Sequence, residues 1–151
     1  KHLGSAYAKA EIGAGNNLPL KGNVFISVNN NDKNETLKIA RDFCEMNYKI
    51  IATKGTSKLL QENGIQCKFI YKVGEGRPNI VDAIKNNQIQ IIINTPLGAQ
   101  SRYDEYEIGR AAIKHRVSVI TTMPGAQAAV RAIRIMKTSS LNHYSLQEIF
   151  K

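Results

Sequence analysis

The run Ile89 to Ile93 constrains the fold of this chain most, because it is nearly all isoleucine. A strand without a polar alternation has no face to turn toward water, and it is typical of a parallel sheet that helices cover on both faces. Four other β-branched or aromatic runs of strand length alternate along the chain with segments of helical apolar spacing. This alternation predicts a three-layer, doubly wound α/β fold with about five parallel strands.

The expected elements follow from these runs and from the residues that punctuate them. Strands are expected over residues 22–28, 48–53, 67–71, 89–93 and 117–122. Gly64 is well placed to end a helix, and Pro78 is expected in the first turn of another. Helices are expected over residues 32–46, 56–63, 79–86, 103–115, 124–136 and 141–151, the last with Ser145 and Glu148 as a capping box.

The first segment differs in composition from the rest. Residues 6–21 are rich in Gly, Asn and Ala and show little apolar periodicity, so residues 1–21 are interpreted as a linker or docking arm. Residues 22–151 then form one domain, and 42% hydrophobic residues in a chain of 151 suffice for a buried core.

The stretch Thr53-Lys54-Gly55-Thr56 stands where the second expected strand gives way to a helix. Hydroxyls and free backbone N–H groups at a helix N-terminus receive an anion well, and glycine lets the backbone approach a ligand. The stretch is therefore a candidate phosphate site. The alternative is that Thr53 or Thr56 only caps the helix, and on local sequence the two readings are about equal.

Other polar side chains follow the ends of other expected strands, where the ligands of parallel sheets bind. Lys33, Lys72 and the pair Asn94-Thr95 lie at such positions. Each has a plain alternative: a surface lysine is usually solvated, and Asn94 and Thr95 could simply end a strand. Arg77 could hold the glycine-rich loop through Glu75 or Asp82, or stay in solvent.

Several function classes find little support. The net charge of +9 is spread over the chain and no nucleic-acid-binding motif accompanies it, so no nucleic-acid partner is expected. No apolar run approaches a membrane span, and Cys44 and Cys67 form neither a CxxC pair nor a metal-ligand cluster. The three histidines are scattered, so no catalytic residues and no metal are expected. The default location is cytoplasmic.

Taken in order, five stretches resemble one family. They are Phe25-Ile26-Ser27-Val28 with Asp32-Lys33, Ala52-Thr53-Lys54-Gly55-Thr56, Lys72-Val73-Gly74-Glu75-Gly76-Arg77-Pro78, Ile92-Ile93-Asn94-Thr95, and the helix text around Arg110. Together they are similar to the C-terminal allosteric domain of the carbamoyl phosphate synthetase large subunit. The resemblance implies a flavodoxin-like, methylglyoxal synthase-like fold, with residues 1–21 connecting from a preceding synthetic domain.

The resemblance also implies a site. In the family, positions matching Ser27, Lys33, Thr53, Thr56, Lys72, Asn94 and Thr95 bind a UMP- or IMP-like effector, and Lys54 and Gly55 lie within the same turn. Thr121 matches a position that touches ornithine in some members.

The resemblance further implies a parent enzyme. That enzyme would make carbamoyl phosphate for arginine and pyrimidine synthesis, using ATP with Mg or Mn and in some cases K. It would be oligomeric and work with a glutaminase small subunit. No cofactor is expected in this domain.

The alternative function is a free-standing lyase of the methylglyoxal synthase type, which shares the fold. Those enzymes follow the first strand with His and Asp, whereas Asn29 and Asn30 stand here. The effector-binding reading is therefore favoured.

Overall fold

The structure is a computed structural model that describes residues 3–14, 18–95 and 101–138. The strands are β1 (Asn23–Val28), β2 (Lys49–Ala52), β3 (Cys67–Phe69), β4 (Ile91–Thr95) and β5 (Ser118–Ile120). The helices are α1 (Leu3–Gly13), the 3-10 turn η1 (Asn30–Asp32), α2 (Lys33–Glu45), α3 (Lys54–Glu62), α4 (Ile80–Lys85), α5 (Ser101–His115) and α6 (Met123–Thr138). The helix expected over residues 141–151 lies outside the described residues.

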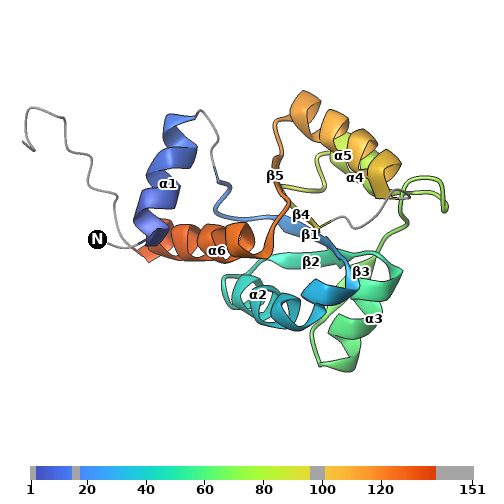
Figure 1. Ribbon diagram of the computed structural model, residues 1–151, viewed down its shortest axis with the longest axis horizontal. Helices are drawn as coiled ribbons and strands as arrows, with labels where there is room; N and C mark the ends of the chain where they lie inside the picture. The colour runs from blue at the N-terminus through green and yellow to red at the C-terminus, as the bar shows by residue number, and fades with distance from the viewer. Residues whose placement is uncertain (1–2, 15–17, 96–100, 139–151) are drawn as a thin grey trace, which may run out of the picture.

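The five strands form one sheet in which every pairing is parallel, in the order β3-β2-β1-β4-β5 (Figure 1). The chain moves outward from β1 to β3, crosses back, and continues on the other side of β1 with β4 and β5. Adjacent strands β1 and β4 therefore form a topological switch point, the place where open α/β sheets bind ligands. The predicted doubly wound class of fold, flavodoxin-like in its all-parallel sheet, is confirmed.

Helices cover both faces of the sheet (Figure 1). Along β4, Ile91 and Ile93 pack into the core with α2, α3 and α6, whereas Ile92 packs into the opposite core with α4 and α5. All three isoleucines are fully buried, which confirms what the isoleucine run predicted. Burying both faces of a central strand is the main apolar driving force for this architecture.

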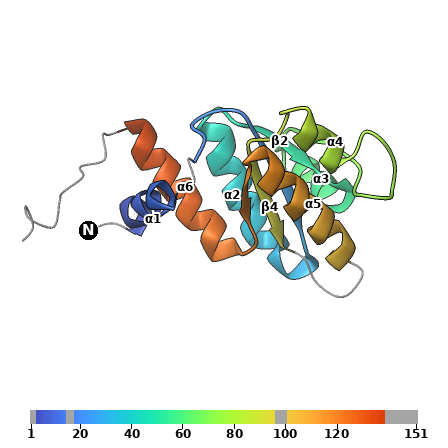
Figure 2. The same ribbon diagram turned by 90° about the horizontal axis from the view of Figure 1, so that it is seen from above.

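The structure contains one helix that the sequence did not predict. Residues 3–13 form α1, which lies across α6 (Figure 2). The contact is close: Ala8 is fully buried, and a Cβ on Gly4 would lie 2.9 Å from the Ile135 side chain. Small residues create this contact without the strong apolar stripe by which helices are recognised. Whether the segment docks onto a preceding domain stays a prediction.

Two helix termini also differ in detail from expectation. The helix expected from residue 32 begins at Lys33, and the side chain of Asp32 before it makes no capping hydrogen bond. Pro78 lies before α4 rather than in its first turn, because Asn79 is the capping residue. Gly64 follows α3 with a φ of +74°, as expected of a glycine that ends a helix.

Replacing Asn79 by alanine should lower the free energy of unfolding by about 1 kcal/mol, the usual cost of losing an N-cap. The Asn79 Oδ1 accepts from the N–H groups of Val81 at 3.0 Å and Asp82 at 3.1 Å, and Asp82 accepts from the Asn79 N–H at 3.0 Å. Urea denaturation measures the change. The control is Asn86→Ala at the other end of α4, and equal losses for the two variants would contradict the assignment.

Candidate functional site

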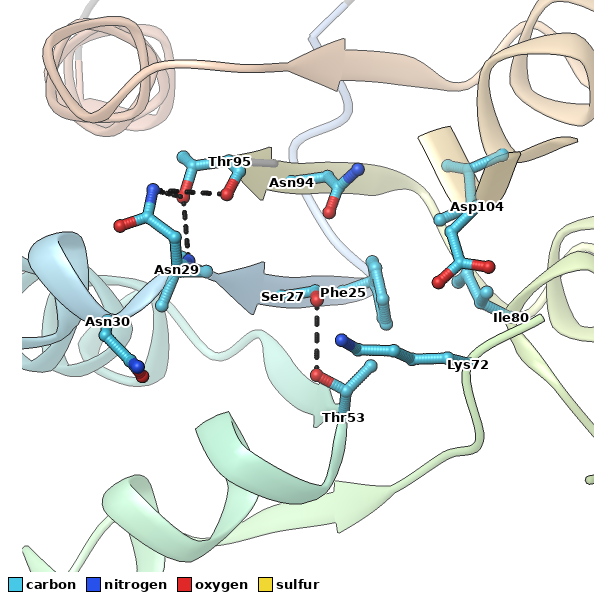
Figure 3. A pocket seen from close by; sticks show the side chains of 12 residues that line it. Phe25, Ser27, Asn29, Asn30, Thr53, Lys72, Ile80, Asn94, Thr95 and Asp104 are labelled. Carbon is cyan, nitrogen blue, oxygen red and sulfur yellow. Dashed lines mark hydrogen bonds between the residues drawn. The ribbon is translucent and has the colours of Figure 1, made fainter. Parts of the chain in front are cut away.

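A cavity of about 290 Å³ opens at the carboxyl edge of the sheet, at the switch point between β1 and β4 (Figure 3). Its walls come from the ends of β1 and β4, from the residue that follows β2, from the loop after β3, and from α4 and α5. The lining residues are Phe25, Ser27, Val28, Asn29, Asn30, Thr53, Lys72, Ile80, Asn94, Thr95, Asp104 and Ile108. The size and the mixed lining suit a small polar molecule with an apolar part.

Five of the residues predicted from the sequence meet in this cavity: Ser27, Thr53, Lys72, Asn94 and Thr95. Thr53 Oγ1 donates to Ser27 Oγ at 3.2 Å, so the two hydroxyls are adjacent. Figure 3 shows the Lys72 ammonium pointing toward this pair. A cation beside two hydroxyls, next to the N-terminus of α3, is an arrangement that favours a phosphate group.

Five other predicted residues do not line the cavity. Thr56 is buried and its Oγ1 accepts from the Val28 N–H at 3.3 Å, which ties α3 to the end of β1. Lys54 and Gly55 are exposed in the first turn of α3, and Lys33 is half-buried at the start of α2. Thr121 is exposed just after β5.

The structure shows whether the side chain of Thr53 caps α3. Thr53 occupies the N-cap position of α3, yet its side chain makes no capping hydrogen bond. Its hydroxyl instead faces the cavity beside Ser27. Capping therefore does not explain the presence of threonine at this position.

Asn29 and Asn30 line the cavity, although the sequence singled them out only as the residues that stand where the lyases have His and Asp. The Asn29 side-chain amide donates to Thr95 O and to Thr95 Oγ1, both at 3.2 Å, and its backbone N–H also donates to Thr95 Oγ1. These bonds join the ends of β1 and β4 across the switch point (Figure 3). Neighbouring strands that are distant in sequence cannot be identified from local pattern, so the pairing could not be anticipated.

Phe25, Ile80 and Ile108 form the apolar wall of the cavity and also belong to the core beneath α4 and α5. The only sequence signal was that Phe25 lies two residues before Ser27 and therefore faces the same side of the sheet. Ile80 and Ile108 come from α4 and α5, and no local pattern in the sequence indicated that these helices would reach the cavity.

Asp104, in the first turn of α5, places a carboxylate on the cavity wall opposite the Ser27–Thr53 pair (Figure 3). Burial raises the pKa of the Asp104 carboxyl above its ordinary value, while Lys72 lowers that pKa and Glu75 raises it. The sequence analysis did not assign this acid to the site. A carboxylate here can accept hydrogen bonds from hydroxyl or amine groups of a ligand.

Asp104→Asn should raise the melting temperature of the unliganded chain near neutral pH. Because the pKa of this acid is higher in the folded chain than in the unfolded chain, its ionisation destabilises the fold, and that cost is absent below the unfolded pKa. The gain should therefore shrink as the pH falls through the pKa of Asp104. Calorimetry from about pH 7 to about pH 3 measures it. The control is the exposed Glu105→Gln, and a gain independent of pH would contradict the prediction.

Charged side chains within residues 72–82 contact one another or the backbone of the loop between β3 and α4. The Arg77 guanidinium lies 3.6 Å from the Asp82 carboxylate, one of the two partners considered for it. Glu75 instead accepts from the Lys72 backbone N–H at 3.4 Å. These contacts shape the segment that carries Lys72 to the cavity.

Within residues 3–14, 18–95 and 101–138, no group of three or more His, Cys, Asp or Glu residues could hold a metal ion. No helix in that part of the chain is both long and apolar enough to cross a bilayer. His115 ends α5, where a helix dipole favours a cation. Among the described residues, the cavity lining contains one carboxylate and no histidine.

Comparisons with a family model and with curated proteins point to the same family. Residues 35–121 match the family model described as an MGS-like domain. The carbamoyl phosphate synthase large chain of Archaeoglobus fulgidus is 52% identical over 97% of this chain, and that of Nostoc sp. is 44% identical over 97%. The C-terminal section of the large chain of Aquifex aeolicus is 44% identical over 99%. The chain spans only 14%, 13% and 29% of the lengths of these three relatives.

Proposed function

The chain belongs to the family of MGS-like domains, and from this premise we propose that it is the effector-binding domain of a carbamoyl phosphate synthase large chain, with a nucleoside monophosphate as its ligand. The parent enzyme would make carbamoyl phosphate from bicarbonate, glutamine-derived ammonia and ATP, for arginine and pyrimidine synthesis. Its partners would be the remainder of the large chain and a glutaminase small subunit.

One observation supports a nucleotide over a free phosphate: the cavity has two polar ends of opposite character. Lys72 with the hydroxyls of Ser27 and Thr53 suits a phosphate. Asp104, on the opposite wall, would repel a second phosphate, but would accept hydrogen bonds from sugar hydroxyls. A sugar monophosphate with an apolar or aromatic group that packs on Phe25, Ile80 and Ile108 would satisfy all parts of the lining.

The proposed role is regulatory. A ligand shifts an equilibrium between two states of an enzyme only by the difference between its affinities for those states. An inhibiting and an activating nucleotide would share the phosphate contacts, so those contacts would set the affinity of the domain for both. Other contacts would decide whether the bound nucleotide inhibits or activates the parent enzyme.

Titration calorimetry of the folded chain with UMP and with IMP tests this function. We expect binding of at least one nucleotide, and much weaker binding of uridine, of inosine and of inorganic phosphate, because each lacks one of the two groups that the cavity receives. Absence of nucleotide binding to the folded chain would reject the proposal. Formation of methylglyoxal from dihydroxyacetone phosphate by the same preparation would favour the lyase instead.

A further inference from the structure

The outward side of α5 exposes large side chains in a stripe. Tyr103 and Tyr106 are each 64% exposed and Ile113 is 82% exposed. With Arg110 they are spaced by three, four and three residues, which places all four on one face of the helix. Isolated apolar residues on a surface are ordinary, but a continuous stripe marks a contact surface.

Cations border this stripe. A groove of about 170 Å³ between α4 and α5 is lined by Val81, Lys85, Glu107, Arg110, Ala111 and Lys114. Among the described residues that line this groove, Glu107 is the one acid beside three cations. The Arg110–Glu107 pair is long at 4.0 Å, and the Arg110 side chain is 71% exposed. An exposed pair of this length contributes little, so Arg110 stays available to another carboxylate.

We propose that the α5 outer face, defined as Tyr103, Tyr106, Arg110, Ile113, Lys114 and Lys85, docks onto a carboxylate-bearing surface of the remainder of the large chain. Tyrosine and arginine around an aliphatic residue are the composition that protein interfaces favour. Because three cations lie on this face, a partner surface that carries carboxylates would complement its charge. The relatives extend far beyond the region that this chain matches, and a parent chain of that length would supply such a partner within the same polypeptide.

The same helix also reaches the cavity. Asp104 and Ile108 line the cavity from the inner side of α5, opposite the stripe. Figure 2 shows α5 in front of the sheet, with the strands behind it. A ligand that contacts the inner side and a partner that contacts the outer side would bias the position of one helix. Their effects on each other's affinity would then be reciprocal. The identity of the docking partner and this coupling both rest on the proposed function.

Acetylation of tyrosines by N-acetylimidazole, read by mass spectrometry without nucleotide, tests the docking. The full-length large chain is compared with the 151-residue chain. We expect Tyr103 and Tyr106 to react at least about tenfold more slowly in the full-length chain, because tethering holds the two surfaces at a millimolar effective concentration. Tyr71, which is 39% exposed at the β3 end of the sheet, provides the internal reference.

Charge reversal separates this docking from general burial. In the full-length chain, Arg110→Glu with Lys114→Glu should restore the reactivity of both tyrosines. The matched control, Lys38→Glu with Arg41→Glu on α2, lies on the opposite face of the sheet and should leave the protection unchanged. Salt of about 1 M, which shortens the Debye length to about 3 Å, should weaken the protection without any substitution.

Three outcomes would overturn the proposal. The first is equal reactivity of Tyr103 and Tyr106 in both chains. The second is protection that appears in the 151-residue chain as its concentration rises, which would assign the surface to a second copy. The third is protection that requires added RNA or anionic vesicles. None of these outcomes bears on nucleotide binding, which calorimetry tests separately.

Discussion

Replacing Lys72 by alanine should weaken the binding of a nucleoside monophosphate by about 10- to 150-fold, which corresponds to about 1.5 to 3 kcal/mol for a charge-assisted hydrogen bond. In the described part of the chain, Lys72 is the only cation that lines the cavity, and its ammonium points toward the hydroxyls of Ser27 and Thr53. Calorimetric titration of the variant with UMP or IMP measures the loss. The melting temperature should change little, because Lys72 is an exposed residue.

Lys54→Ala provides the matched control, since the resemblance to the family places Lys54 next to the phosphate turn, whereas its side chain does not line the cavity. We expect the affinity of this variant to stay within about threefold of the wild type, as for an exposed charge that acts only at a distance. Unchanged affinity for Lys72→Ala, or an equal loss for Lys54→Ala, would move the phosphate away from the Ser27–Thr53 pair and toward the exposed turn.

The elements of the sheet could be predicted because each one carries its own local signal. The isoleucines of β4 have no polar alternation, and Gly64 ends α3 in the conformation that glycine adopts most readily. The five predicted residues that line the cavity follow the same logic. They stand at strand ends or in the residues that follow strands, and the carboxyl ends of parallel strands meet at one edge.

The parts that sequence could not supply depend on contacts between distant segments. The Asn29–Thr95 hydrogen bonds join residues that are 66 positions apart, and Asp104 reaches the cavity from α5 only after the crossover from β4. Thr56 belongs to the expected phosphate turn, and its hydroxyl accepts a hydrogen bond from the Val28 backbone N–H at the end of β1, a contact that local sequence does not indicate.

The helix α1 shows why composition alone misleads at the start of the chain. Six of its 11 residues are glycine, alanine or serine, so they contribute little to a hydrophobic stripe, and its stability depends on packing against α6. A partner helix more than a hundred residues away cannot be inferred from the local sequence. The prediction of a linker or docking arm therefore missed the helix, and its relation to a preceding domain stays open to test.

Phe43→Ala should have the largest effect on stability, a loss of about 3 to 5 kcal/mol in the free energy of unfolding, because it leaves a cavity in a closely packed core. Phe43 is fully buried and its ring meets the ring of Tyr48 edge-on at 5.2 Å. For a chain of this size, such a loss should lower the melting temperature by roughly 6 to 20 °C. Calorimetry measures the change. The matched control, Phe69→Ala, removes a ring that is 39% exposed and pairs with Tyr71, so it should cost no more than about 1.5 kcal/mol.

Phe43→Ala also tests whether a change in the core alters the affinity of the cavity for the nucleotide. Phe43 lies near the end of α2, beside the start of β2, and thus at the edge of the sheet opposite the cavity. At a temperature where Phe43→Ala is still folded, its affinity for the nucleotide should therefore match that of the wild type, whereas Lys72→Ala should show the reverse pattern. A stable Phe43→Ala would contradict the packing, and a folded variant with weakened nucleotide binding would show that the core and the cavity are coupled through the sheet.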